Sequence, residues 1–190
     1  MSFILASASP RRKTLLARAG LDFEIIVSEV DESLFCSEGL TSAEHAKILA
    51  LEKAKAVAKK SPDRLVMGAD TVVDCNGMII GKPEDAADAE KITRMLFSRP
   101  HEVITGVALV RIADKTEIVE SATTVVYPKK LTEQQIMNHI KNGRWQGKAG
   151  AYGIQETDDE FVEKIEGSFT NVMGLPMELV KEMLAKTSSR

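Results

Sequence analysis

The sequence predicts an α/β protein in which short strands alternate with capped helices. Three observations indicate this class. Residues 3–6 form a short apolar segment typical of a strand, and Ser9 is a suitable N-cap for a helix that follows it directly. The apolar run 65–69 is typical of a buried strand. A hairpin is predicted at Asn76-Gly77, because both residues tolerate the positive φ of a type I′ turn.

The other elements are predicted from β-branched content, capping residues and hydrophobic periodicity. The helix after residues 3–6 begins at Pro10 and stops at Gly20. The remaining strands are expected at 23–27, 102–112, 117–126 and 161–165. The remaining helices are expected at 41–60, 85–97, 132–142 and from residue 177 to about residue 186.

The bulk composition limits the classes of protein to consider. A chain of 190 residues with 44% hydrophobic and 28% charged residues suits a single globular domain, 1–190, with a sizeable core. No apolar stretch approaches the ~20 residues that span a membrane. Cys36 and Cys75 lie far apart, which favours a reducing, cytoplasmic location. The net charge of −3 argues against stable nucleic-acid binding, but it permits a local basic pocket.

The loop between the first strand and the first helix is a candidate anion site. Free amides at a helix N-terminus attract anions, and this loop adds hydroxyl groups from Ser7 and Ser9. Arg11 and Arg12 supply guanidinium groups, which match phosphate oxygens in a bidentate way. The alternative is a capped surface helix with solvated arginines.

Asp70 is expected where the buried strand 65–69 reaches the surface, and Lys82 returns beside it after the hairpin. Ligands of open α/β sheets bind beyond the carboxyl ends of the strands, so Asp70 is a candidate functional carboxylate. The alternative is that Asp70 only terminates the strand and bonds to local amides.

Two further charged features have both a functional and a structural interpretation. The acids in residues 28–32 suit a divalent cation such as Mg²⁺, but such clusters are also common in solvated loops. Lys53 lies on the apolar stripe that contains Ala46, where an unpaired ammonium is costly. It either extends to the edge of the core or points at an anion.

The glycine-rich segment 147–155 permits close backbone approach to a flat or charged group. Gln155 offers a paired donor and acceptor that suit the edge of a base. The alternative is a tight loop with a packing tyrosine.

Taken together, these motifs resemble the Maf family of nucleoside triphosphate pyrophosphatases over essentially the whole chain. The motifs that carry the resemblance are Leu5-Ala6-Ser7-Ala8-Ser9-Pro10-Arg11-Arg12, Gly68-Ala69-Asp70-Thr71, Gly81-Lys82-Pro83, residues 148–155 and residues 171–176. The resemblance implies a mixed, strongly curved β-sheet flanked by helices, with a substrate cleft between two lobes, as in inosine triphosphatase-like proteins. It also implies hydrolysis between the α- and β-phosphates, a divalent metal (Mg²⁺ or Mn²⁺) and a homodimer.

The resemblance assigns roles by position. It implies Asp70 as general base and Asp70 with Glu32 as metal ligands. The positions that match phosphate-contacting residues of the family are Ser7, Arg11, Arg12, Lys53 and Lys82. The positions linked to nucleotide choice are Arg11, Thr71 and Gln155.

The motif 148–155 resembles the subgroup that acts on dTTP and UTP, rather than the sister subgroup that acts on 7-methyl-GTP. CTP and modified pyrimidine nucleotides are further candidate substrates, with removal of non-standard nucleotides as the physiological task. The chain departs from the family at 156–159, which leaves open how Glu156 affects the rim of the base pocket, and at 98–101.

Two other classes compete with this interpretation. One is a non-catalytic nucleotide-binding regulator of cell division or septum formation, which would need the anion loop but not Asp70. The other is a phosphatase with an aspartyl nucleophile. Such enzymes need a second aspartate two residues later, where this chain has Val72.

Overall fold

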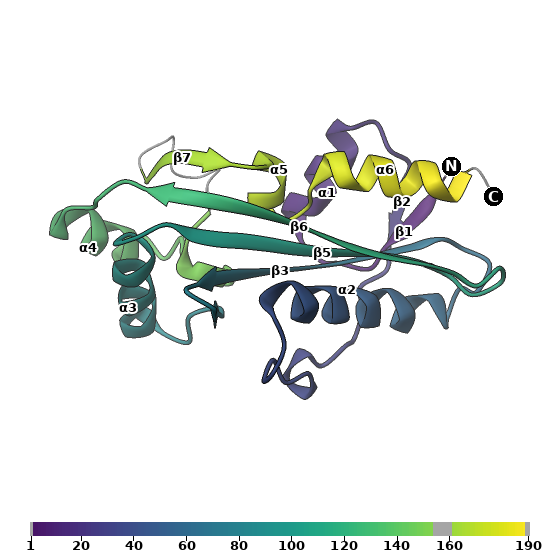
Figure 1. The fold of residues 1–190 in the computed structure, drawn as a ribbon, viewed down its shortest axis with the longest axis horizontal. Helices are drawn as coiled ribbons and strands as arrows, with labels where there is room; N and C mark the ends of the chain where they lie inside the picture. Colours follow the sequence, from purple (N-terminus) through teal and green to yellow (C-terminus); the bar gives the residue numbers. More distant parts are fainter. Residues whose placement is uncertain (1, 154–160, 189–190) are drawn as a thin grey trace.

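A single mixed β-sheet forms the centre of the computed structural model, which describes residues 2–153 and 161–188 (Figure 1). Within these residues the sheet has seven strands in the order β2-β1-β3-β5-β6-β7, with β4 paired to β3. β1 runs parallel to β2 and β3, and all other neighbours are antiparallel. The strands are β1 (Phe3–Leu5), β2 (Phe23–Ile25), β3 (Val66–Cys75), β4 (Met78–Ile80), β5 (His101–Arg111), β6 (Thr116–Pro128) and β7 (Val162–Glu166).

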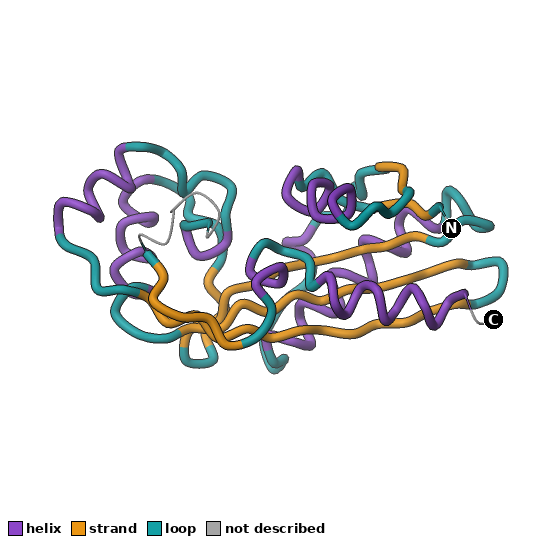
Figure 2. The backbone as a smooth tube through the Cα atoms, turned by 90° about the horizontal axis from the view of Figure 1, so that it is seen from above, coloured by secondary structure: helices purple, strands orange, loops and turns teal. Residues whose placement is uncertain are grey.

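Helices cover both faces of the sheet at one end and gather beside it at the other. α2 lies on one face, α1 and α6 lie on the opposite face, and α3 and α4 lie together at the far end of the long strands (Figure 1). The sheet bends between these two ends, so the protein has two lobes (Figure 2). The helices are α1 (Pro10–Arg18), α2 (Ser42–Ala58), α3 (Ala86–Leu96), α4 (Glu133–Lys141), α5 (Phe169–Val172) and α6 (Met177–Ser188).

The predicted mixed, curved sheet flanked by helices is therefore confirmed. In the part of the chain that the structure describes, no helix combines the length and apolar character needed to cross a bilayer. The hairpin prediction is also confirmed, since Asn76 and Gly77 have φ values of 55° and 78° between β3 and β4.

The backbone of α2 lies almost directly on β3 and β5, because glycines face it. A Cβ atom added to Gly68 would lie 2.1 Å from the carbonyl oxygen of Ala50. A Cβ atom added to Gly106 would lie 2.3 Å from the carbonyl oxygen of Ala46. Only glycine permits this approach, which brings the side chains of α2 within reach of polar groups on β3.

The prediction that Asp70 ends a strand is wrong. β3 continues to Cys75, and Asp70 pairs with Gly106 in the middle of a ladder with β5 that extends to Asp74. The reason is that the segment after Asp70 is rich in β-branched residues and has a long antiparallel partner. It is β1 that ends here, because its ladder with β3 stops at Met67.

The early end of β1 leaves part of β3 with an open edge. Ala6 donates its N–H to the carbonyl of Met67, after which the chain turns away into the loop before α1. β4 occupies the same edge only from Val73 onward. Residues 68–72 of β3 are thus paired with β5 on one side, and on the other side they pair with no strand of the described part of the chain. This gap between β1 and β4 is where the polar residues collect.

Candidate active site

A cavity of about 630 Å³ lies along the open edge of β3. Both lobes contribute to its walls, which include the loop before α1, the 3-10 turn η1 (Glu32–Leu34), α2, β3 and the segments on either side of the 3-10 turn η2 (Ala149–Ala151). The polar side chains that line it include Ser7, Ser9, Arg11, Arg12, Glu32, Lys53, Asp70, Thr71, Lys82, Gln146 and Lys148. The cleft between two lobes that the sequence predicts is therefore present.

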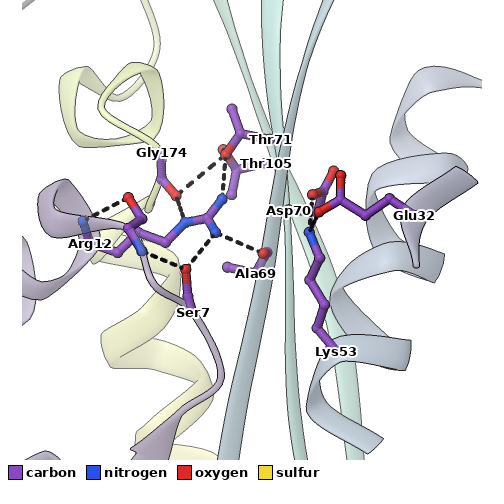
Figure 3. Close-up of polar contacts among 10 residues, drawn as sticks. Ser7, Arg12, Glu32, Lys53, Ala69, Asp70, Thr71, Thr105 and Gly174 are labelled. Carbon is purple, nitrogen blue, oxygen red and sulfur yellow. Dashed lines mark hydrogen bonds and ion pairs between the residues drawn. The ribbon is translucent and has the colours of Figure 1, made fainter. Parts of the chain in front are cut away.

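Lys53 joins two carboxylates on the α2 side of β3. Its Nζ atom lies 2.6 Å from Oδ1 of Asp70 and 2.7 Å from Oε1 of Glu32 (Figure 3). Lys53 and Asp70 are buried, whereas 47% of the Glu32 side chain is exposed. The two alternatives for Lys53 are thereby resolved, because it points at anions, and these anions belong to the protein itself.

Electrostatics keep Glu32 charged. Burial by itself would raise the pKa of the Glu32 carboxyl, since a charged group loses solvation. The hydrogen bond from Lys53 and the positive charges of Lys53, Lys82 and Arg12 outweigh this effect. The pKa of Glu32 consequently lies below its ordinary value, and its carboxylate is available as an anionic partner near neutral pH.

The other acids of residues 28–32 do not join Glu32. Glu29 forms an exposed ion pair with Lys60, at 3.0 Å between Oε2 and Nζ. Asp31 accepts hydrogen bonds from the backbone N–H and the hydroxyl of Ser33, at 3.0 and 2.6 Å, and so caps η1. Of the three acids, only Glu32 therefore belongs to the site.

The residues present fit a hard divalent cation that shares its shell with a ligand. Among the described residues no three histidine, cysteine, aspartate or glutamate side chains form a group able to hold a metal by themselves. Asp70 and Glu32 nevertheless both place an oxygen within 2.7 Å of one ammonium, so they already converge on a cation. Mg²⁺ is commonly bound by one or two carboxylates together with substrate phosphates and water.

The loop before α1 is held by its own serines. Ser9 caps α1 by accepting a hydrogen bond from the backbone N–H of Arg12. Ser7 accepts from the backbone N–H of Ser9 at 3.2 Å and from Nη1 of Arg12 at 3.1 Å. Both bonds use oxygen lone pairs of Ser7, so its hydroxyl hydrogen is left to donate into the cavity.

The two arginines of the loop have different surroundings. Arg11 lines the cavity and extends toward the other lobe, where its Nη1 lies 3.4 Å from the position that a Cβ atom on Gly153 would take. Arg12 points into the protein and donates to the carbonyls of Ala69 and Gly174 and to the hydroxyls of Ser7 and Thr71 (Figure 3). Burial lowers the pKa of Arg12, and the negative charge of Asp70 opposes this effect.

Thr71 and Lys82 both line the cavity. The hydroxyl of Thr71 lies 3.0 Å from that of Thr105 and 3.0 Å from Nη2 of Arg12. Gln155, the third predicted determinant of nucleotide choice, lies outside the described residues, as does Glu156.

Several residues of the cavity wall are absent from the predicted set. Val103 and residues 172–174 form part of the wall, and so do Gln146 and Lys148. The motifs 171–176 and 148–155 were signals for residues 172–174 and Lys148, because both motifs belong to the family resemblance, whereas Gln146 lies outside them. Nothing in the sequence singles out Val103, whose place in the wall depends on the neighbouring strands.

Several known proteins are similar to this chain over nearly its whole length. The chain is 47% identical over 176 residues to a dTTP/UTP pyrophosphatase of Geotalea uraniireducens, which covers 93% of this chain and 90% of that protein. A dTTP/UTP pyrophosphatase of Moorella thermoacetica is 47% identical over 182 residues, covering 96% and 93%. A third, from Citrifermentans bemidjiense, is 45% identical over 176 residues, covering 93% and 90%.

Among solved structures, the Ham1 protein of Staphylococcus aureus aligns with a TM-score of 0.47 and 18% identity, covering 68% of this chain and 73% of that one. A HAM1 protein from Coxiella burnetii aligns with a TM-score of 0.46 and 17% identity, covering 69% and 74%. The family model described as "Maf-like protein" matches residues 2–187. The match spans nearly the whole chain, including every motif on which the predicted resemblance depends, and the chain belongs to the Maf family.

Proposed function

We propose that this protein hydrolyses nucleoside triphosphates between the α- and β-phosphates, releasing a monophosphate and pyrophosphate, with dTTP and UTP as its main substrates. The observation that carries the proposal is the contact of Lys53 with Asp70 and Glu32 in the same cavity as the cationic loop before α1. The names of the similar proteins support the same reaction and the same two nucleotides.

Positive charge and hydroxyl donors at the cavity suit a triphosphate. Arg11, Lys53 and Lys82 line it, and the hydroxyl of Ser7 has a hydrogen to donate. In phosphoryl transfer, such groups neutralise the charge that develops on the oxygens of the leaving group. Arg12 lies behind Ser7, and its charge adds to the field of the loop.

Asp70 is proposed as the general base. Lys53 fixes its Oδ1 atom, which leaves Oδ2 to accept a proton from a water molecule that attacks the α-phosphorus. Asp70 and Glu32 would hold Mg²⁺ or Mn²⁺ together with phosphate oxygens. Such a metal, when bound, polarises the phosphoryl oxygens and withdraws charge from the reacting phosphorus.

Nucleotide choice is proposed to depend on Arg11, Thr71 and Gln155. Arg11 and Thr71 line the cavity, and Gln155 follows Gly153, against which Arg11 lies. CTP and modified pyrimidine nucleotides are further candidate substrates, with removal of non-standard nucleotides in the cytoplasm as the task. A homodimer remains a prediction from the family resemblance.

The experiment that tests the reaction is pyrophosphate release from dTTP, UTP, CTP, 7-methyl-GTP and the common purine triphosphates. Each nucleotide is assayed with Mg²⁺, with Mn²⁺ and with a chelator. We expect metal-dependent release that is fastest from dTTP or UTP. Tight binding of these nucleotides without turnover would contradict the proposal and would favour a nucleotide-binding regulator.

A further inference from the structure

Arg12 joins three segments that are far apart in the sequence. Its Nε donates to the carbonyl of Gly174 at 2.8 Å, and its Nη1 donates to the carbonyl of Ala69 at 2.9 Å and to the Ser7 hydroxyl at 3.1 Å. Its Nη2 donates to the Thr71 hydroxyl at 3.0 Å. All four acceptors are neutral groups of the protein, so most of the hydrogen-bonding capacity of the guanidinium is used inside the chain.

The bond to Ala69 has a specific structural reason. Ala69 lies on the open edge of β3, beyond the point where β1 ends and before β4 begins. The carbonyls of Leu65 and Met67 on this edge accept from Ile4 and Ala6, but among the described residues no strand pairs with Ala69 on this side. Arg12 takes the place of the missing strand, and an unsatisfied carbonyl there would be costly.

The bond to Gly174 connects the same edge to a wall of the cavity. Residues 172–174 line the cavity, and the carbonyl of Gly174 accepts from Arg12. The wall is fixed at its other end by Asn171, which is buried and donates through Nδ2 to the carbonyl of Val103 and the hydroxyl of Thr124, both at 2.9 Å. Arg12 thus contributes the shorter side-chain hydrogen bond to the carbonyl at the cavity end of this wall.

Thr71 is part of the same arrangement. Its hydroxyl contacts Arg12, the hydroxyl of Thr105 at 3.0 Å and the carbonyl of Gly174 at 3.4 Å. One guanidinium group therefore contacts both the Thr71 hydroxyl and the 172–174 wall (Figure 3).

We infer that Arg12 is a positioning residue whose planar fork sets the spacing between the Ser7 loop, Thr71 and the wall 172–174. Through this spacing it controls nucleotide selectivity, rather than by contacting a phosphate. The part of the inference that concerns selectivity rests on the proposed function. A lysine cannot replace the fork, because it carries the same charge on a single nitrogen and cannot reach acceptors on several sides of a plane.

The first test is hydrogen exchange of the amides of residues 172–175 in the nucleotide-free protein. The variants are Arg12→Lys, which keeps the charge, and Arg12→Gln, which removes it, with Lys13→Gln as a control at an exposed position on the same helix. We expect exchange to accelerate by about tenfold or more in both Arg12 variants, because bonds to a charged group are lost in each. The control should match the wild type. Wild-type exchange in Arg12→Lys would overturn the inference, as would acceleration in Arg12→Gln alone.

The second test is selectivity, measured as the ratio of kcat/KM for dTTP to that for dGTP. We expect Arg12→Lys to reduce this ratio by about tenfold, a change that a simple loss of stability does not produce. Thr71→Val should shift the ratio in the same direction, and the double variant should be no worse than Arg12→Lys, because the two side chains act as a unit. Additive effects would overturn the inference.

Thr71→Val also provides the exchange measurement if the Arg12 variants do not fold, since it removes one acceptor and retains the arginine. Faster exchange at 172–175 in this variant supports the inference, and unchanged exchange contradicts it. If the wild type hydrolyses no nucleotide, the proposed function fails, but the exchange measurements still decide whether Arg12 holds the wall.

Discussion

The two faces of β3 at the cavity differ in chemistry, although the residues that represent them, Asp70 and Thr71, are adjacent in the sequence. Asp70 points toward α2 and meets Lys53, which also contacts Glu32. Thr71 points to the opposite face, as successive residues of a strand do, and meets Arg12. The first face is a cluster of opposite charges, and the second is a cation surrounded by neutral acceptors (Figure 3).

This difference indicates how each face should respond to substitution. On the Asp70 face, removing one charge leaves another charge buried without its partner. The effect of a substitution on stability and activity should therefore depend on the charge of the new side chain. On the Thr71 face, Arg12 donates to carbonyls and hydroxyls in fixed directions. The effect of a substitution there should therefore depend on the shape of the new side chain, even when its charge is retained. The predictions below test the charged face and the packing that creates it.

The largest effect is expected for Asp70→Asn. The amide keeps the shape of the carboxylate but cannot accept a proton, so kcat for pyrophosphate release from dTTP should fall by about 10²–10⁴. Circular dichroism should show an unchanged fold, because Lys53 retains Glu32 as a partner. Near-wild-type kcat in a folded variant would remove Asp70 from its proposed role.

The next effect is expected for Lys53→Met. This change leaves the carboxylates of Asp70 and Glu32 close together without their common cation, and breaking such a buried pair costs about 3–5 kcal/mol. Urea unfolding measures the loss. Lys55→Met on the same helix is the control, because Lys55 forms a more exposed pair with Glu117 and should lose no more than about 1 kcal/mol. Equal losses would show that the charged face has no special stability.

Gly68→Ala tests the packing that brings Lys53 to Asp70. The new Cβ atom would lie 2.1 Å from the carbonyl oxygen of Ala50, so α2 must move away from the sheet. We expect a loss of about 1–3 kcal/mol in the free energy of unfolding, together with reduced kcat. Gly81→Ala is the control for stability, because nothing lies within 4 Å of its added Cβ atom. Stability equal to the control would contradict the close approach of α2.

The smallest effect is expected from the pH dependence of Glu32→Gln. The pKa of Glu32 is lowered in the folded protein, so the stabilisation from its carboxylate is complete above the ordinary value of 4.5 and is lost as the pH falls through the lowered pKa. The difference in Tm between wild type and variant should therefore be present at pH 7 and shrink toward zero at acidic pH. Because Glu32 is about half exposed, the difference should correspond to less than about 1 kcal/mol. A difference independent of pH would show that the charge of Glu32 does not contribute.

Local features were predicted correctly from the sequence where a nearby side chain forms the hydrogen bonds of the free backbone groups at a helix end. The capping box of α2 is present, with the Thr41 hydroxyl accepting from the N–H of Glu44 and the Glu44 carboxylate accepting from the N–H of Thr41. Ser9 caps α1, as expected. Such bonds join residues three apart, so their partners are visible in the sequence. Element ends were less accurate, since the strand expected at 23–27 is only Phe23–Ile25.

The sequence indicated which residues belong to the candidate site, but it did not predict how their side chains are arranged. The predicted position of Asp70 at the end of its strand was wrong, because the length of β3 depends on pairing with β5 about 35 residues later. The different surroundings of Arg11 and Arg12 were also not visible, since adjacent residues of a helix point in different directions. The acids of residues 28–32 were separated only by the path of their loop.

The sequence by itself determined the longer helices, the Asn76-Gly77 hairpin and the family to which the chain belongs, but not the short helix α5. These features depend on neighbours along the chain or on motifs of a few residues. The tertiary structure decided that β1 stops short of β4, that Arg12 closes the open edge, and that Lys53 meets Asp70 and Glu32. The contact of Lys53 with Asp70 depends on the close packing of α2 against Gly68 and Gly106. All of these contacts join segments whose distance in space no local pattern encodes.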